Sequence, residues 1–278
     1  MRLHPRYTQA VAYVVLGSAT LLTLLILFFI IFFILQKGIP VINLGFIFNK
    51  PQDMGRAGGI FPTIVASLYL PLLAILIALP MGVGTAVYLT EYTRETNLTR
   101  LIRFGVDCLA GIPSIIFGLF GFIFFVTMLK MGWSLLSGGL TLAFMILPTI
   151  IRTSEEAIKS VPNAYREVSF SLGATRWRTV MKVVLPNALP GILTGVMLGI
   201  GRSIGETAAV IFTAGSSLRM ATSVFDSART MSVHFYILAR EGISTENAYG
   251  TAAMLIFSVL LVNSIAYWTL NRYIAKKS

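Results

Sequence analysis

The chain has 278 residues, of which 56% are hydrophobic and only 12% charged, and its mean hydropathy is +0.81. Soluble domains carry about 25% charged residues, so this composition excludes a soluble globular protein. The formal net charge is +11, but the basic residues do not gather on one soluble face, which argues against nucleic acid as a partner. The single cysteine, Cys108, leaves no disulfide framework or thiolate metal site. His4 and His234 are isolated, and we expect both to be solvated or interfacial.

Six segments contain no Asp, Glu, Lys or Arg, namely 7–36, 57–90, 108–129, 131–151, 183–201 and 247–271. A helix needs about 20 residues to cross a bilayer, so each segment is long enough for one span. These segments lack the period-2 alternation of barrel strands, which leaves helices to satisfy the backbone in lipid. The sequence therefore predicts an all-α, polytopic membrane protein with six transmembrane helices.

The first helix is expected over about 10–35, in an apolar run that is too long for a signal peptide. The second, over about 60–90, contains Pro62, Pro71 and Pro80, so we expect it to be bent or broken. Further along we expect a polar inner loop (91–105), a third helix with Pro113 near its start, and a Gly-rich outer turn (130–139). A fourth helix should end near 151 and be followed by a long inner segment (152–186) and a fifth helix (187–214). The last elements expected are an outer segment with a re-entrant or surface helix (215–248) and a sixth helix (249–271).

The distribution of Lys and Arg orients these spans. With the N-terminus inside, 14 of the 22 basic residues fall in inner segments and 7 in outer ones, and Arg202 is the remaining one. This excess follows the positive-inside rule, so both termini are expected in the cytoplasm.

Small residues repeat along the fifth helix. Gly191, Gly195 and Gly199 recur at four-residue spacing, which lets helix backbones approach closely. The spacing leaves two interpretations open, packing inside one subunit or packing against a partner subunit around a shared pathway.

The inner segment between the fourth and fifth helices holds a short amphipathic element. Pro162 suits a first helical turn, Tyr165, Val168 and Leu172 form one apolar stripe, and Gly173 ends the helix. Such a helix can lie on the membrane surface or fit a groove on a soluble partner.

This segment resembles the EAA loop of bacterial binding-protein-dependent ABC importer permeases, whose pattern is EAA-x3-G-x9-I-x-LP. Glu167, Val168 and Ser169 stand at the EAA positions, followed at the family spacing by Gly173, Val183 and Leu185-Pro186. Val168-Ser169 for Ala-Ala and Val183 for Ile are mild departures. In that family the loop docks onto the ATP-binding subunit, so the resemblance implies a coupling surface made of Tyr165, Glu167, Val168, Ser169, Leu172 and Gly173.

Other stretches resemble the permease subunits of phosphate importers, among them GGIFPTIVASLYL (58–70), GIPSIIFGLFG (111–121), GRSIGETAAVIFTAG (201–215) and VHFYILAREG (233–242). The resemblance implies the MetI-like fold, with an N-terminal helix and outer loop (1–57) before a permease core (58–278) whose coupling loop covers about 155–186. It also implies a homologous permease subunit, a dimeric ATP-binding subunit and a periplasmic phosphate-binding protein as partners in a bacterial cytoplasmic membrane. No Walker A sequence occurs in the chain, so ATP and Mg are expected on the partner ATPase, with no cofactor and no catalysis in this chain.

Two charges interrupt the fifth helix. Arg202 and Glu206 are four residues apart, so on one helix they can pair, and Ser203 and Thr207 neighbour them. An unpaired charge at that depth costs at least about 2.5 kcal/mol. The pair either fixes helix packing or faces a water-filled path, where guanidinium replaces the hydration of an oxyanion. On the second interpretation the pathway residues are Arg202, Ser203, Glu206 and Thr207.

The alternatives within the importer class are permeases for sulfate, molybdate or phosphonate. Outside it, a stand-alone channel or an ion-coupled transporter needs no EAA loop, and a membrane enzyme needs an ionisable cluster that we do not find in the sequence. The most specific prediction is a phosphate permease subunit energised by a separate ATPase.

Overall fold

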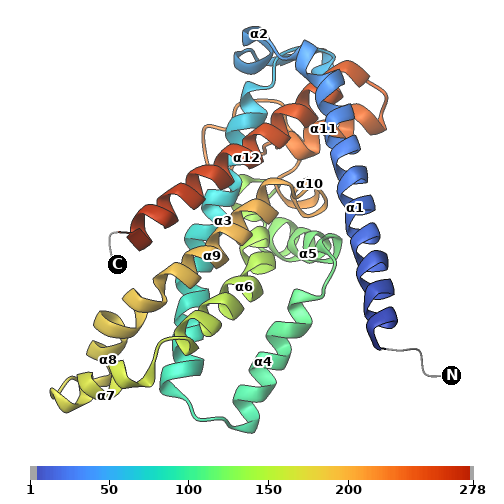
Figure 1. Ribbon diagram of the computed structural model, residues 1–278. Coiled ribbons are helices and arrows are strands. Elements are labelled where there is room, and N and C mark those ends of the chain that lie inside the picture. Colours follow the sequence, from blue (N-terminus) through green and yellow to red (C-terminus); the bar gives the residue numbers. More distant parts are fainter. Residues whose placement is uncertain (1–4, 276–278) are drawn as a thin grey trace.

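A computed structural model describes residues 5–275 of the chain, so His4 lies outside the described residues (Figure 1). In chain order the helices are α1 (Pro5–Gly38), α2 (Leu44–Phe48), α3 (Phe61–Val87), α4 (Asn97–Ala110), α5 (Ser114–Gly121), α6 (Leu135–Lys159), α7 (Asn163–Ser171), α8 (Arg176–Thr179), α9 (Leu185–Ile204), α10 (Ala208–Thr213), α11 (Met231–Arg240) and α12 (Thr245–Ala275). Short 3₁₀ turns are η1 (Ile39–Val41) and η2 (Asp53–Gly55), and π-helical segments are η3 (Tyr88–Tyr92), η4 (Phe122–Met128) and η5 (Val180–Val184). Two-residue strands β1 (Pro51–Gln52) and β2 (Ala57–Gly58) pair antiparallel.

Five helical segments are long and apolar enough to cross a membrane, namely Val11–Val41, Phe61–Tyr92, Leu135–Lys159, Arg176–Ile204 and Thr245–Arg272. A sixth consists of the bent pair Asn97–Ala110 and Ser114–Met128. The predicted all-α, multi-span architecture is confirmed, with six spans when the bent pair counts as one.

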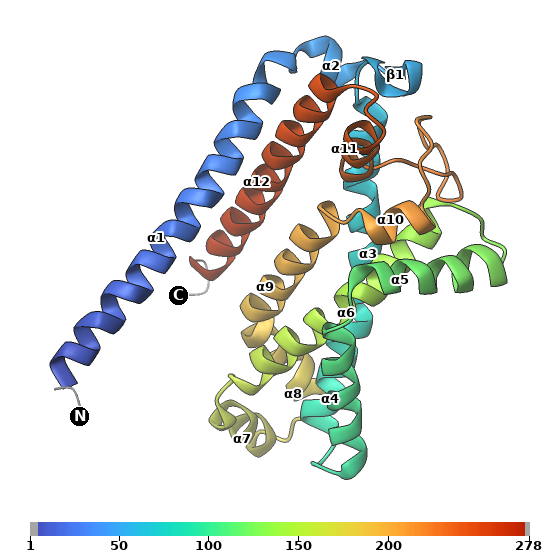
Figure 2. The same ribbon diagram turned by 90° about the vertical axis from the view of Figure 1, so that its right-hand side faces the viewer.

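The helices form an elongated bundle. Figures 1 and 2 show α3, α6 and α9 in its centre, α1 and α12 along one flank, and α5 and α10 on the other side. We call the end that carries α7 and α8 the α7 end, and the end that carries α2 and α11 the α11 end.

The centre of the core lies on α6. Leu142, Met145, Ile146 and Ile150 recur at i, i+3, i+4 and i+8, so they form one helical stripe, and each is at most 1% exposed. They share one buried cluster with small residues of α3 and α10, among them Ala74, Ala78 and Ala209. Because small side chains face large ones, α3 and α6 run in close contact through the bundle.

The peripheral helix α1 is apolar almost throughout, and its side chains are largely exposed over its described length. Near its C-terminal end it packs against α12, where the Phe33 and Tyr249 rings meet edge to face with centroids 5.9 Å apart. Gly38 lies directly against the Tyr249 carbonyl, so a larger residue there would separate the two helices.

The prediction of an inner loop over 91–105 is wrong, because α4 begins at Asn97 inside that range. Thr96 and Thr99 form a reciprocal capping box: each hydroxyl accepts the other residue's backbone N–H, at 3.3 and 2.9 Å. The third apolar run is also not one straight helix, because α4 and α5 meet at a bend of 100°. Pro113 explains the bend, since it disfavours helical geometry at the residue before it.

The helices α3, α6 and α9 also differ from the predicted second, fourth and fifth helices. Despite Pro71 and Pro80, α3 is an unbroken helix from Phe61 to Val87, so the expected break is absent from that span. Helix α6 continues to Lys159 rather than ending near 151, because its charged residues pair along the helix: Lys159 Nζ lies 2.7 Å from Glu155 Oε1. The fifth helix ends at Ile204, not at 214.

The segment 215–248, predicted to be an outer one, holds α11, which is buried along much of its length. His234 on α11 is 1% exposed, so the expectation of a solvated or interfacial histidine is wrong. Its ring is enclosed between α11 and the turn at Gly55, and Arg229 Nη1 lies 3.5 Å from its Nδ1.

Candidate functional site

The predicted coupling segment folds as α7, α8 and η5, which run into α9. Gly173 ends α7 with a φ of +79°, a left-handed conformation that glycine adopts without strain. Thr175 then caps α8 by accepting the Arg178 N–H. The sequence therefore folds locally as helix, glycine turn and helix, as the spacing of Pro162 and Gly173 predicts.

The apolar stripe of α7 faces away from the bundle. Tyr165, Val168 and Leu172 are 50, 59 and 82% exposed, and Glu167 is exposed beside them. Ser169, by contrast, is buried, and its Oγ is 2.8 Å from Thr179 Oγ1. Figures 1 and 2 show α7 beyond the ends of α6 and α9. This geometry presents a convex apolar surface that can enter a groove on a partner.

Arg166 ties the inner face of α7 to the end of α3. Its Nη2 and Nε lie 2.6 and 3.0 Å from Glu91 Oε1 in η3, and both side chains are nearly buried. The same guanidinium donates to the backbone carbonyls of Val161 and Ile158, at 2.7 and 3.0 Å. A charge-assisted pair with further carbonyl contacts is stronger than an exposed ion pair, so α7 and α3 are held together.

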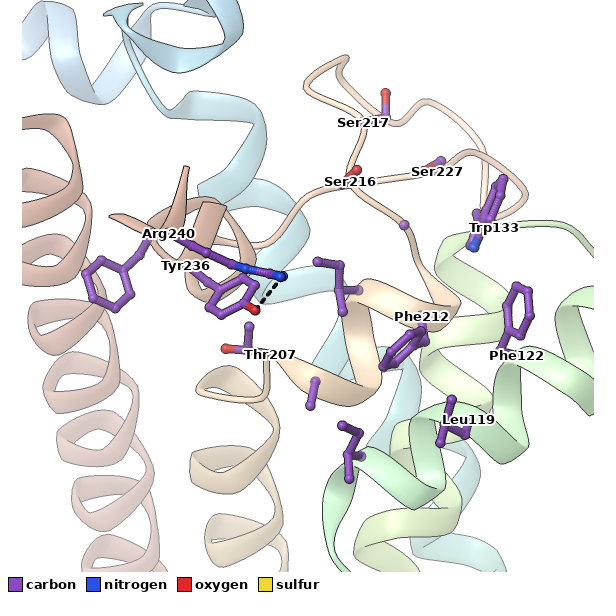
Figure 3. A pocket seen from close by; sticks show the side chains of 15 residues that line it. Leu119, Phe122, Trp133, Thr207, Phe212, Ser216, Ser217, Ser227, Tyr236 and Arg240 are labelled. Carbon is purple, nitrogen blue, oxygen red and sulfur yellow. Dashed lines mark hydrogen bonds between the residues drawn. The ribbon is translucent and has the colours of Figure 1, made fainter. Parts of the chain in front are cut away.

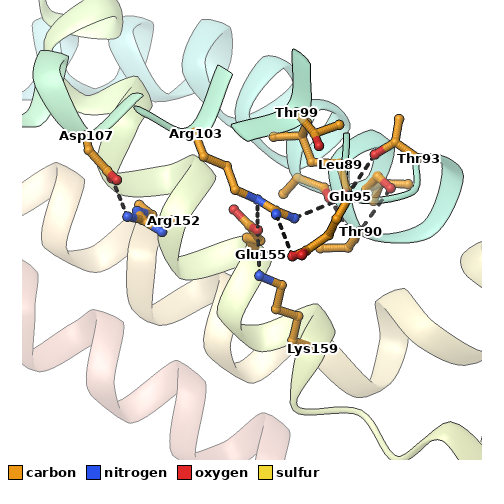
Figure 4. A network of polar contacts seen from close by, with 12 residues as sticks. Leu89, Thr90, Thr93, Glu95, Thr99, Arg103, Asp107, Arg152, Glu155 and Lys159 are labelled. Carbon is orange, nitrogen blue, oxygen red and sulfur yellow. Dashed lines mark hydrogen bonds and ion pairs between the residues drawn. The ribbon is translucent and has the colours of Figure 1, made fainter. Parts of the chain in front are cut away.

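A second group of charged residues connects α4, the C-terminal part of α6 and η3, which follows α3 (Figure 4). Glu155 on α6 is 2% exposed, and its Oε1 lies 2.7 Å from both Arg103 Nε and Lys159 Nζ. Arg103, on α4, also donates to the Leu89 carbonyl of η3 and pairs with Glu95. A buried carboxylate with two cationic partners is compensated, so this cluster joins α3, α4 and α6.

The glycine repeat of α9 faces α6 of the same chain. A Cβ at Gly191 would lie 2.6 Å from Ala157 Cβ, and one at Gly195 would overlap Thr153 Oγ1. At Gly199 the nearest neighbour is Ile146, at an ordinary 3.6 Å. The backbones of α9 and α6 therefore approach closest at Gly191 and Gly195.

The pairing of Arg202 with Glu206 is wrong for this structure. Gly205 follows the last residue of α9, and a turn separates it from α10, so the two charges are not on one helix. Glu206 Oε1 instead accepts the Ala209 N–H at the start of α10, at 3.4 Å. Among the described residues, Arg202 makes no ion pair.

The four predicted pathway residues separate into different surroundings. Arg202 lines a hollow of about 250 Å³ together with Asn263 and Tyr267 of α12. Ser203 is 3% exposed, and its hydroxyl has no hydrogen-bond partner within the described part of the chain. Thr207 instead lines a much larger cavity on the other side of the helix break.

That cavity has a volume of about 940 Å³ and lies between α5, η4, α10 and α11 near the α11 end (Figure 3). Apolar side chains such as Leu119, Phe122 and Phe212 form much of its wall. The polar side chains that line it are Thr207, Ser216, Ser217, Ser227, Tyr236 and Arg240, and no carboxylate is among the lining residues. Such a wall combines low polarity with hydrogen-bond donors, as small-molecule sites do.

The loop after α10 closes the cavity in a defined conformation. Arg229 Nε donates to the Ser216 carbonyl at 2.8 Å, and Ser227 Oγ donates to the Ala214 carbonyl at 2.9 Å. Asp226 accepts the backbone N–H groups of Thr222 and Ser223, and these hydrogen bonds lower the pKa of the Asp226 carboxyl. These bonds fix the serines of the loop at the rim.

Sequence reasoning missed Arg166, Glu91, Tyr236 and Arg240. Arg166 and Glu91 are 75 residues apart, so no local spacing links them. A usable signal for Arg240 existed, since it is one of the basic residues that the sequence places in an outer segment against the charge bias. Tyr236 stands four residues before it on the same helix face.

The fold, with five helices long and apolar enough to cross a membrane and a sixth, bent candidate, is that of an integral-membrane protein. The family model described as "Binding-protein-dependent transport system inner membrane component" matches residues 78–277. The chain therefore belongs to this family, whose members are permease subunits of ABC transporters and are not themselves catalytic.

Two related proteins are named as ABC transporter permeases or phosphate permeases. The chain is 33% identical over 261 residues to "Probable ABC transporter permease protein YqgI" of Bacillus subtilis, with 88% of each chain covered. It is 34% identical over 241 residues to "Phosphate transport system permease protein PstA" of Pasteurella multocida, with 85% of each covered.

Solved structures share the fold. A bacterial ABC transporter for import of the acidic polysaccharide alginate matches with a TM-score of 0.67 at 17% identity, over 96% of this chain and 99% of that one. The MetNI methionine ABC transporter in an inward-facing conformation matches with a TM-score of 0.61 at 22% identity, over 77% and 94%. These likenesses establish a MetI-like permease fold.

Proposed function

We propose that this chain is the permease subunit of an ATP-driven importer that moves inorganic phosphate across the bacterial cytoplasmic membrane. The observation that carries the importer assignment is the exposed apolar face of α7, held to the bundle by Arg166 and Ser169. Phosphate as the substrate is supported by the relatives named as phosphate permeases, which match at 30–34% identity. A permease for sulfate, molybdate or phosphonate is the alternative.

In this proposal energy reaches the chain through α7. Tyr165, Val168 and Leu172 enter a groove on a dimeric ATPase that binds ATP and Mg, with Glu167 beside them and Gly173 shaping the turn. Closure of the ATPase moves α7, and the Arg166–Glu91 pair passes this motion to α3. Both termini and α7 lie on the cytoplasmic side, as the distribution of Lys and Arg predicts.

The complex also needs a path and a delivery partner. A homologous permease subunit completes the path, and a periplasmic phosphate-binding protein delivers the anion at the α11 end. In this proposal Arg202 and Thr207 line the path on either side of the turn after Ile204, with Ser203 and Glu206 beside them. Arg202→Gln should then abolish uptake while the complex still assembles, and undiminished uptake would remove Arg202 from the path.

Stimulation of ATP hydrolysis tests the substrate assignment. The assembled complex is reconstituted with its binding protein, and hydrolysis is measured with phosphate, sulfate, molybdate or a phosphonate. We expect phosphate to give the largest stimulation. A larger response to another oxyanion contradicts the phosphate assignment and leaves the importer assignment in place.

A further inference from the structure

The cavity between α5, α10 and α11 has an unusual set of polar groups. Beside the indole N–H of Trp133, its polar side chains are hydroxyls and one guanidinium, and none of its lining residues is acidic. Anionic oxygens accept hydrogen bonds from such groups, whereas a cation finds no counter-charge among them. The cavity therefore selects for negative charge.

Arg240 is the only charged side chain of this lining set. Its Nη1 donates to Tyr236 Oη at 2.9 Å, and its guanidinium carbon lies 5.6 Å from the centre of the Tyr236 ring. Within residues 5–275 it makes no ion pair. Figure 3 shows Arg240 at the left of the lining residues, pointing toward the centre of the view, with Tyr236 beside it and Thr207 below the tyrosine. Donors of the guanidinium thus stay available for a ligand.

The neighbouring Arg229 shows what a purely structural arginine of this segment looks like. It is 7% exposed, donates to the Ser216 carbonyl and lies against His234. Arg240, by contrast, is exposed and oriented by a single side chain. The two differ in that Arg229 holds the loop in place and Arg240 faces open space.

We propose that this cavity binds a tetrahedral oxyanion through Arg240, Tyr236 and Thr207, as a receiving site near the α11 end. The inference rests on the proposed function, because it places the anion on its way into the membrane. The guanidinium supplies paired donors that match two oxygens of the anion. The hydroxyl of Thr207, which donates to the Gly205 carbonyl only over a long 3.5 Å, can turn to supply another. Apolar walls from Leu119 and Phe212 limit hydration and strengthen these bonds.

Arg240→Gln is the first test, measured as uptake of inorganic phosphate by proteoliposomes that contain the whole complex and its binding protein. A hydrogen bond to a charged group contributes enough for a loss of about tenfold or more in uptake at subsaturating phosphate. Arg240→Lys keeps the charge but not the paired donors, so it should recover part of the loss. Thr207→Val should lower uptake by a smaller factor.

Arg219→Gln is the matched control, because Arg219 belongs to the same outer segment and does not line the cavity. It should transport at the wild-type rate. The yield of assembled complex on gel filtration is compared for every variant, which separates a folding defect from a lost site.

The outcomes distinguish the site from the proposed function. Phosphate uptake that depends on Arg240 supports both. Phosphate uptake that survives Arg240→Gln and Thr207→Val overturns the site and leaves the proposed function in place. Uptake of another oxyanion, lost in Arg240→Gln, supports the site and contradicts the phosphate assignment.

Discussion

At the scale of single residues, His234 shows how burial sets a charge state. Burial, and then the nearby positive charge of Arg229, lower the pKa of His234 from 6.5 to about 4. The folded chain therefore keeps the ring neutral at pH values where the unfolded chain binds a proton. The stability that comes from this difference is present above pH 6.5 and is lost as the pH falls toward 4.

We therefore expect the midpoint temperature of thermal unfolding to decrease as the pH is lowered from 6.5 to 4.5. The shift in pKa corresponds to at most about 3 kcal/mol over the whole window. His234→Asn should flatten this pH dependence, measured by differential scanning fluorimetry of the detergent-solubilised protein. An equally steep dependence in the variant would contradict the role of His234.

A second residue-scale prediction concerns Gly195. An alanine there would overlap Thr153 Oγ1 on α6, and overpacking of this kind costs about 1–3 kcal/mol. Gly195→Ala should lower the midpoint of thermal unfolding. Gly84→Ala is the control, since a Cβ at Gly84 in α3 meets nothing within 4 Å and alanine favours the helix. Equal midpoint temperatures for the two variants would show that Gly195 is not needed for the close approach of α6 and α9.

At the scale of elements, the Arg166–Glu91 pair connects α7 with α3. Arg166→Glu places two carboxylates against each other and leaves the carbonyls of Val161 and Ile158 without their donor. Removal of one partner from a buried pair costs about 3–5 kcal/mol. We expect ATP hydrolysis to continue at a reduced rate and phosphate uptake per ATP to fall severalfold.

The charge swap is the control for this prediction. Glu91→Arg combined with Arg166→Glu restores opposite charges but not the carbonyl contacts, so the uptake per ATP should recover in part. A double variant that is no better than the singles would mean that the pair does not act as a unit.

The exposed face of α7 gives a further element-scale prediction. Val168→Asp puts a charge at the centre of the apolar stripe, so the ATPase should no longer co-purify with the chain. Leu98→Asp, at an exposed leucine of α4 outside the coupling segment, should retain the ATPase. Equal retention in both variants would show that the ATPase binds elsewhere.

At the scale of the whole molecule, the fold was predictable because apolar runs must match the bilayer thickness. The runs do not reveal their own interruptions: the 100° bend before Ser114 lies inside a run that contains no charge, and α9 ends at Ile204, inside the range 187–214 predicted for the fifth helix. The exposed stripe of α7 was predictable from local spacing. The arrangement of distant segments depends on packing that no local pattern encodes. Examples are the Arg166–Glu91 pair and the cavity that Thr207 and Arg240 both line.

We propose that this permease chain carries phosphate only when a separate ATPase drives it through α7. Uptake of radiolabelled phosphate by proteoliposomes tests it most directly, with the full complex compared with the complex without ATP and with the Val168→Asp variant. We expect ATP-dependent uptake by the full complex, not reduced by excess sulfate, and no uptake by the complex without ATP or by the Val168→Asp variant. Phosphate uptake by this chain without ATP or ATPase would contradict it.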